Sequence, residues 1–125
     1  MKILHLCSSD ISGGAARAAY RLNMGLKRIG VESRMLVQDK RSGDLSVIGP
    51  KTNVQKGITM LRKGLDPLPL SIYKNRQKIP WSCSWLPDNL YKTINNINPD
   101  IVNLHWLNNG FMNINSLKKI NAKIV

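Results

Sequence analysis

The side chains that could do chemistry in this chain lie in two short polar segments, each of which follows an apolar run. The first segment, Ser8 to Gly14, carries the carboxylate of Asp10 and ends in a Gly-Gly pair. The second, His105 to Gly110, carries an imidazole and the amide of Asn108. A glycine turn that leads into a helix lets backbone N–H groups approach an anion. These residues therefore predict a site for an anionic ligand.

The candidate residues of this site each have an ordinary structural alternative. Asp10 can complement a helix dipole, Arg17 can be a solvated side chain, and the glycines can serve the turn alone. His105 can be a packed, hydrogen-bonded residue at the end of a strand. We expect substrate to be bound by Gly13, Gly14, Asp10, Arg17, His105 and Asn108, with His105 as the candidate for catalysis, and we expect neither a metal nor a resident cofactor.

The elements that must position these residues begin at the N-terminus. The apolar run Ile3 to Cys7 predicts a buried strand. The helix after the glycine turn is predicted to begin at Ser12 as its N-cap and to end before Gly30. Another strand is predicted from Arg34 to Gln38. The expected inward face of the helix consists of residues at helical spacing: Ala15, Ala18, Leu22, Leu26 and Ile29.

The rest of the chain is less regular until residue 87. Residues 53 to 65 have an amphipathic helical pattern. Residues 70 to 86 have no clear period, which favours a peripheral strand or loop over a lid that faces the acceptor. A helix that carries Leu90, Ile94 and Ile97 then leads into a strand from Ile101 to His105. A short helix over 113–121 and a strand from Ala122 to Val125 follow.

This order of elements predicts an α/β fold with a Rossmann-like, doubly wound parallel sheet. We expect the strand at 3–7 to lie between the strands at 34–38 and 101–105, because short uninterrupted apolar runs are typical of central parallel strands. Ligands of such sheets bind beyond the carboxyl ends of the strands, where the strand order reverses. Gly13, Gly14 and His105 are therefore expected to face a common crevice.

The chain resembles the N-terminal domain of a GT-B glycosyltransferase of the family 4 kind. The matching segments are Lys2 to Leu6, Asp10 to Leu22, Asn98 to Trp106 and, more weakly, Trp81 to Pro87. The block Gly13-Gly14-Ala15-Ala16-Arg17 is the most specific part of the match. The resemblance covers most of the 125 residues in order.

The resemblance implies an incomplete GT-B architecture, in which residues 1–125 form part of the N-terminal, acceptor-side domain. The donor would be a sugar nucleotide and the acceptor a glycan or a lipid-linked glycan of the cell envelope or of an exopolysaccharide. A C-terminal domain, in the same chain or in a separate one, would supply most of the contacts to the donor. We expect the 125-residue chain alone to be inactive.

Several other activities are disfavoured by motifs that the sequence lacks. The first turn matches neither the P-loop nor the dinucleotide-binding pattern G-x-G-x-x-G. Glu32 is the only glutamate, so paired glutamates for glycosidase chemistry are absent. Cys7 and Cys83 are far apart, which favours reduced thiols and a cytoplasmic protein over a disulfide.

The formal net charge of +12 is concentrated in the middle of the chain. Between Lys51 and Pro80, only Asp66 opposes the basic residues Lys51, Lys56, Arg62, Lys63, Lys74, Arg76 and Lys78. Such a cluster fits either a solvated surface or peripheral binding to the anionic inner face of a membrane. The alternative function is a non-catalytic basic module that binds a phosphorylated ligand, nucleic acid or a membrane. Nucleic acid is the less favoured partner, because no basic–aromatic motif is present.

Overall fold

The computed structural model of the chain describes residues 1–75, 77, 79 and 81–125. Its centre is a five-stranded sheet with the strand order β3-β2-β1-β4-β5, and every neighbouring pair is parallel. The arrangement is consistent with a Rossmann-like fold, and the predicted central position of the first strand is confirmed. The strands are β1 (Lys2–Ser9), β2 (Glu32–Asp39), β3 (Val47–Ile48), β4 (Ile101–Leu104) and β5 (Lys123–Ile124).

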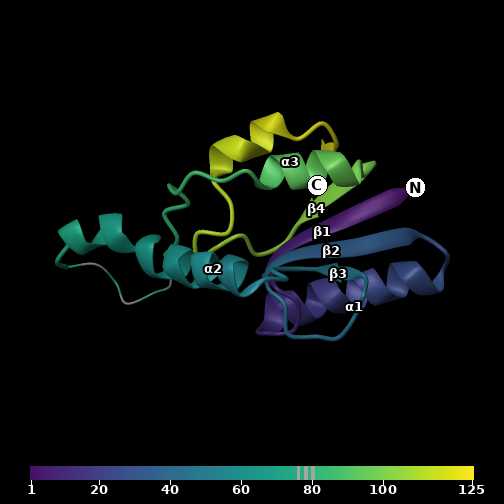
Figure 1. Ribbon diagram of the computed structural model, residues 1–125, viewed down its shortest axis with the longest axis horizontal. Coiled ribbons are helices and arrows are strands. Elements are labelled where there is room, and N and C mark those ends of the chain that lie inside the picture. The colour runs from purple at the N-terminus through teal and green to yellow at the C-terminus, as the bar shows by residue number, and fades with distance from the viewer. Residues whose placement is uncertain (76, 78, 80) are drawn as a thin grey trace.

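Helices cover both faces of the sheet (Figure 1). Helix α1 (Gly14–Arg28) lies on one face, whereas α3 (Leu90–Ile97) and the 3₁₀ helix η2 (Ile114–Lys119) lie on the other. Helix α2 (Asn53–Leu65) and the 3₁₀ helix η1 (Leu68–Ile72) extend away from the sheet at the carboxyl ends of the strands. We call the segment from 53 to 75 the projecting arm.

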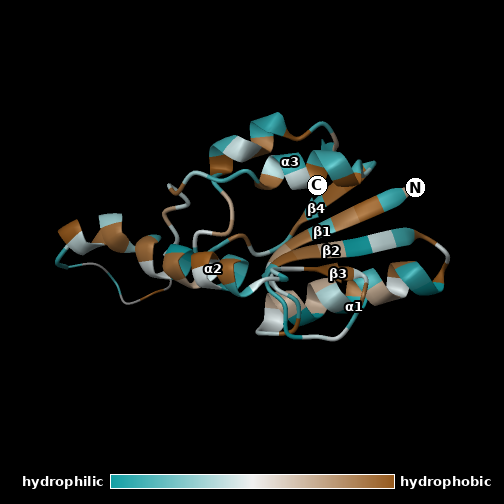
Figure 2. Ribbon diagram, in the orientation of Figure 1, coloured by the Kyte–Doolittle hydropathy of each residue, from teal (hydrophilic) through white to brown (hydrophobic). Residues whose placement is uncertain are grey.

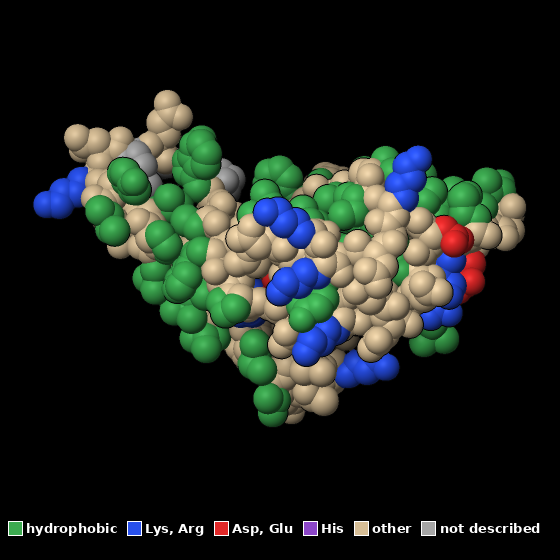
Figure 3. Space-filling model, turned by 90° about the horizontal axis from the view of Figure 1, so that it is seen from above, with side chains coloured by type: hydrophobic (Ala, Val, Ile, Leu, Met, Phe, Trp, Pro, Cys, Tyr) green, Lys and Arg blue, Asp and Glu red, His purple; other side chains and the backbone are tan. Residues whose placement is uncertain are grey.

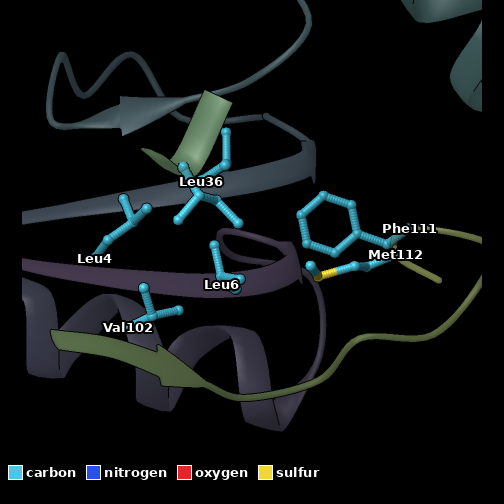
Figure 4. Close-up of a cluster of buried hydrophobic side chains, with 7 residues drawn as sticks. Leu4, Leu6, Leu36, Val102, Phe111 and Met112 are labelled. Carbon is cyan, nitrogen blue, oxygen red and sulfur yellow. The ribbon is translucent and has the colours of Figure 1, made fainter. Parts of the chain in front are cut away.

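The strands contain long hydrophobic segments, brown in Figure 2. Their buried side chains divide between two apolar clusters. Leu4 and Leu6 of β1 pack on the α3 face against Leu36, Val102 and other buried side chains (Figure 4). Cys7 packs on the α1 face, together with Met35, Val37, Val47, Ala16 and Ala19. Burying each large side chain contributes about 1.5–3 kcal/mol, so the two clusters hold the sheet between its helices.

Two predictions about α1 are wrong. The helix begins at Gly14 with Gly13 as its N-cap, and Ser12 is exposed. Its buried residues are Ala16, Ala19 and Asn23 rather than the face that contains Ala15 and Leu22. The small alanines allow close packing on the sheet, and the Asn23 amide is buried because it bonds Ser33 and Ser46. The predicted helix end is confirmed, since Gly30 follows the C-cap with a φ of +82°.

Helix α2 has the predicted bounds, but its apolar stripe does not pack into the core. All of its side chains are exposed or half-buried, and Val54, Ile58 and Leu61 are more than half exposed. A reciprocal capping box between Thr52 and Gln55 stabilises its first turn. The helix is therefore held by its cap and by a few anchoring contacts, and much of its apolar stripe remains exposed.

Candidate functional site

Two adjoining hollows lie at the carboxyl edge of the sheet, between β1 and β4. The chain passes from β1 outward to β2 and β3 on one side, and from β4 to β5 on the other, so the strand order reverses here. One hollow of about 270 Å³ is lined by Gly13 and Gly14, and the other, of about 240 Å³, by Asn108. Both include Ser8, Ser12 and Trp106, and we call the pair the switch-point crevice.

The glycine end of the crevice is the open N-terminus of α1. Gly13 has a φ of +93°, a left-handed conformation that strongly favours glycine. A Cβ added at Gly13 or Gly14 would meet nothing within 4 Å, so free space remains beside the helix start. No described side chain caps the helix and its first turn holds no acidic residue. Its N–H groups are therefore available to an anion.

The other end of the crevice carries opposed charges. Arg41 donates to Asp39 Oδ2 from Nε at 3.2 Å and from Nη2 at 3.1 Å, and Lys63 Nζ lies 3.5 Å from the same oxygen. All three residues line this hollow. Asn108 lines it too, and its Oδ1 is buried without a hydrogen-bond partner in the described part of the chain. This end offers an excess positive charge and an acceptor for a ligand hydroxyl.

Asp10 is placed away from the ligand side of the crevice. The side chain is fully buried, and its carboxylate accepts hydrogen bonds from the backbone N–H groups of Arg41 at 3.0 Å and Ser42 at 2.8 Å. Burial raises the pKa of Asp10, but the hydrogen bonds from Ser42 and Arg41 outweigh it and hold the pKa below its ordinary value. Asp10 therefore fixes the loop after β2, which carries Arg41 into the crevice.

Arg17 remains at the surface. Its Nε lies 3.4 Å from the carbonyl oxygen of Ile11, at the limit of a hydrogen bond, and the side chain is exposed. It is not among the residues that line either hollow of the crevice. The geometry thus leaves Arg17 one turn from the glycines, on the solvent side of α1.

His105 is half-buried and belongs to a chain of polar side chains that leads into the interior through His5, rather than to the lining of the crevice. Its Nε2 lies 3.1 Å from His5 Nδ1, and His5 Nε2 lies 3.1 Å from Ser33 Oγ. Ser33 donates its proton to Asn23 Oδ1, so His5 must donate from Nε2 and accept at Nδ1. His105 therefore donates from Nε2. The expectation that His105 shares a crevice with Gly13 and Gly14 is wrong, because its ring turns back toward β1.

Both imidazoles of this chain are held neutral. Burial, and secondly repulsion by His105, lower the pKa of His5 from 6.5 to about 4. Burial also lowers the pKa of His105. Neither ring is positioned as a base toward the glycine hollow.

Trp106 lines both hollows and was not among the predicted site residues, and neither were Asp39 and Arg41, which line the second hollow. Trp106 directly follows His105, and its backbone carbonyl accepts a hydrogen bond from Ser8 N–H at 2.7 Å. That bond ties the loop after β4 to the end of β1, and the indole lies beside both hollows. The sequence feature that could have indicated Trp106 is its position at the end of a predicted strand, next to His105.

The basic cluster divides into structural and free residues. Arg62 is structural, because its guanidinium donates to the carbonyl oxygens of Gly110 at 2.8 Å and Pro87 at 2.6 Å. Lys56 and Lys74 are exposed. The predicted cluster members Arg76 and Lys78 lie outside the described residues.

The described part of the chain holds no cluster of three or more metal-ligating side chains. Among the described residues, no helix is both long and apolar enough to cross a bilayer. Comparison of the sequence and the structure with protein-family models, curated proteins and solved structures finds no match. The arrangement supports binding of an anion that also carries hydroxyl groups, and shows no nucleophile paired with a base at the crevice.

Proposed function

We propose that this chain is the N-terminal, acceptor-side unit of a glycosyltransferase that uses a sugar nucleotide. The observation that carries the proposal is the open start of α1 beside Gly13 and Gly14, at the reversal point of a parallel sheet. The sequence resemblance to GT-B enzymes is most specific at this same turn. A leaving diphosphate needs fixed positive potential, which helix N–H groups supply without reorganisation.

In this proposal each part of the crevice has a separate task. The first N–H groups of α1 face the phosphate oxygens, and Asn108 Oδ1 accepts a hydrogen bond from a sugar or acceptor hydroxyl. Trp106 provides a flat apolar wall, a surface on which sugar rings pack well. His105 and Asp10 position the loops and do not touch the ligand. The remaining donor contacts belong to a second Rossmann-like unit, in a continuation of the chain or in a separate chain.

The first experiment asks whether the glycine end binds an anion. We expect pyrophosphate to give saturable amide shifts at Gly13, Gly14 and Ala15 in ¹⁵N NMR spectra. Gly14→Leu should abolish these shifts, because its side chain would enter the free space beside the helix start. Gly25→Leu is the matched control, since a Cβ there also meets nothing within 4 Å and the site lies elsewhere on α1.

The second experiment separates a transferase from a binding module. Transfer from a panel of sugar nucleotides is measured with the full product of the natural reading frame, including anything that follows Val125. We expect transfer that Gly14→Leu removes and Gly25→Leu retains. Pyrophosphate binding without any transfer would instead support the non-catalytic module for phosphorylated ligands.

A second proposed property is peripheral membrane association through the projecting arm. Hydrophobic side chains gather along the arm in Figure 3, and Leu61, Leu68, Ile72 and Tyr73 are all more than half exposed. Exposed apolar residues beside lysines are the features of an interfacial segment. The inner membrane face would then be where the acceptor is met.

A further inference from the structure

A further hollow of about 550 Å³ lies between the end of β2 and helix α2, and we call it the basic pocket. Its charged lining residues are one carboxylate and four cations, which leaves an excess of three positive charges: Asp39, Lys40, Arg41, Lys56 and Lys63. The basic pocket shares Asp39, Arg41 and Lys63 with the Asn108 hollow of the crevice, but it shares no residue with the glycine hollow. A concave surface with this charge attracts and concentrates anions.

Most of the cations in the basic pocket are already held in place. Asp39 accepts from Arg41 and pairs with Lys63, as described above. Lys40 Nζ donates to the carbonyl oxygens of Asp44 at 2.7 Å and Val47 at 2.8 Å. Lys56 is exposed at the rim, on the surface of α2. Since little side-chain freedom remains to be lost at three of these cations, binding an anion costs less entropy than at a flexible lysine cluster.

A second cavity, of about 590 Å³ and with a partly apolar lining, adjoins the basic pocket. The two share Gln38, Pro50 and Thr59 as lining residues. The cavity lies over the α3 face of the sheet, and its apolar lining residues include Leu36, Ile48, Ile58, Leu90 and Phe111. Its other lining residues are largely polar, and Lys51, Arg62 and Asp88 are charged. This volume is within the range of small-molecule sites, which combine an apolar lining with a few polar groups.

Gln38 marks the junction of the two spaces. The residue is only 5% exposed, and its Nε2 donates to the carbonyl oxygen of Asn109 at 2.9 Å. Its Oε1 is buried and has no hydrogen-bond partner among the described residues. A buried acceptor without a donor is costly, so a ligand hydroxyl at this junction would be favoured. The acid proton of a phosphate monoanion is one such donor.

We propose that the basic pocket and the adjoining cavity together bind a phosphate monoester that carries an apolar substituent. The phosphate lies among Arg41, Lys56 and Lys63, and the substituent lies in the cavity beside Ile58 and Phe111. The inference goes beyond the proposed function, because phosphoester binding here requires neither the glycine hollow nor sugar transfer.

The test compares three probes at physiological salt: decyl phosphate below its micelle concentration, inorganic phosphate and decyl maltoside. Isothermal titration calorimetry gives each dissociation constant. We expect decyl phosphate to bind at least about tenfold more tightly than either other probe, because only it uses both spaces. If inorganic phosphate binds as tightly as decyl phosphate, the cavity makes no contribution. If decyl maltoside binds as tightly as decyl phosphate, the cations make none. Either result overturns the proposal.

Variants then locate the site. Lys56→Gln should weaken decyl phosphate by about tenfold, the loss expected for one charge-assisted hydrogen bond. Lys92→Gln is the matched control, because Lys92 is exposed on α3 and the substitution removes the same charge. Equal weakening by both variants would mean non-specific attraction to a basic protein, which overturns the proposal. Ile58→Asn should reduce the ratio of the affinities for decyl phosphate and inorganic phosphate. An unchanged ratio would also contradict the proposal.

The two proposals fail independently in these measurements. Gly14→Leu is expected to leave decyl phosphate binding unchanged, and Lys56→Gln is expected to leave the pyrophosphate shifts at Gly14 unchanged. Loss of decyl phosphate binding in Gly14→Leu would place the phosphate in the crevice and overturn the proposal that the basic pocket binds it.

Discussion

Lowering the pH from about 7 to about 5 should destabilise this protein through a single buried side chain, His5. The ring is fully buried and bonded at both nitrogens, to Ser33 and to His105. Its pKa is about 4 in the folded protein against an ordinary 6.5. In the unfolded chain the ring is free to bind a proton as the pH falls through 6.5. The unfolded state therefore binds more protons in this window, and acidification favours it.

The size of the effect follows from the two pKa values. A difference of one in pKa is worth about 1.4 kcal/mol, so the complete loss below pH 4 would be on the order of 3 kcal/mol. Between about pH 7 and 5 the unfolded ring becomes almost fully protonated and the folded ring hardly at all. The expected loss over this window is about 2 kcal/mol from His5, and the lowered pKa of His105 adds to it in the same direction.

The assay is urea unfolding at several pH values, with the free energy of unfolding extrapolated to water. The chain has only two histidines, so few imidazoles contribute to the change between about pH 7 and 5. The His105→Gln variant leaves His5 as the sole imidazole, and the Gln amide can still donate to His5 Nδ1. The pKa of His5 measured by NMR in this variant should remain well below 6.5, because burial is the larger cause of its lowered pKa. A free energy of unfolding that stays constant from pH 7 to 5, or a His5 pKa near 6.5, would refute the reasoning.

Two further results are expected. Asp10→Asn should lower the free energy of unfolding in urea by about 2 kcal/mol. An amide at this position cannot accept from the N–H groups of both Arg41 and Ser42 without turning its own donor toward one of them. A decrease of less than about 0.5 kcal/mol would mean that other contacts hold this loop. The protein should co-sediment with vesicles that contain anionic lipid, and raised salt should weaken this binding. Ile72→Ser on the projecting arm should also weaken it. Leu45→Ser, at a similarly exposed site outside the arm, should leave it unchanged. Equal binding to neutral vesicles would exclude the charge-based model, and salt-resistant RNA binding would favour the nucleic-acid alternative.

Local sequence was sufficient to predict the sheet and most of its helices. The apolar runs at residues 3–7 and 101–105 predict central strands, because only buried parallel strands tolerate such continuous apolar character. The bounds of α2 and the end of α1 at Gly30 were also predictable from local residue preferences. The strand β3 was missed, since two residues carry no detectable period.

The sequence alone located the edge of the sheet where the crevice forms, because parallel strands and right-handed connections leave little choice of topology. Only the tertiary structure decided which side chains line it. His105 and Trp106 are adjacent in sequence, yet the histidine turns back to His5 and the tryptophan lines the crevice. Likewise, the alanines of α1 match two neighbouring faces equally well, and the partners Ser33 and Ser46 select the face with Asn23. Such choices depend on hydrogen bonds between residues far apart in the chain, and neither spacing nor composition encodes them.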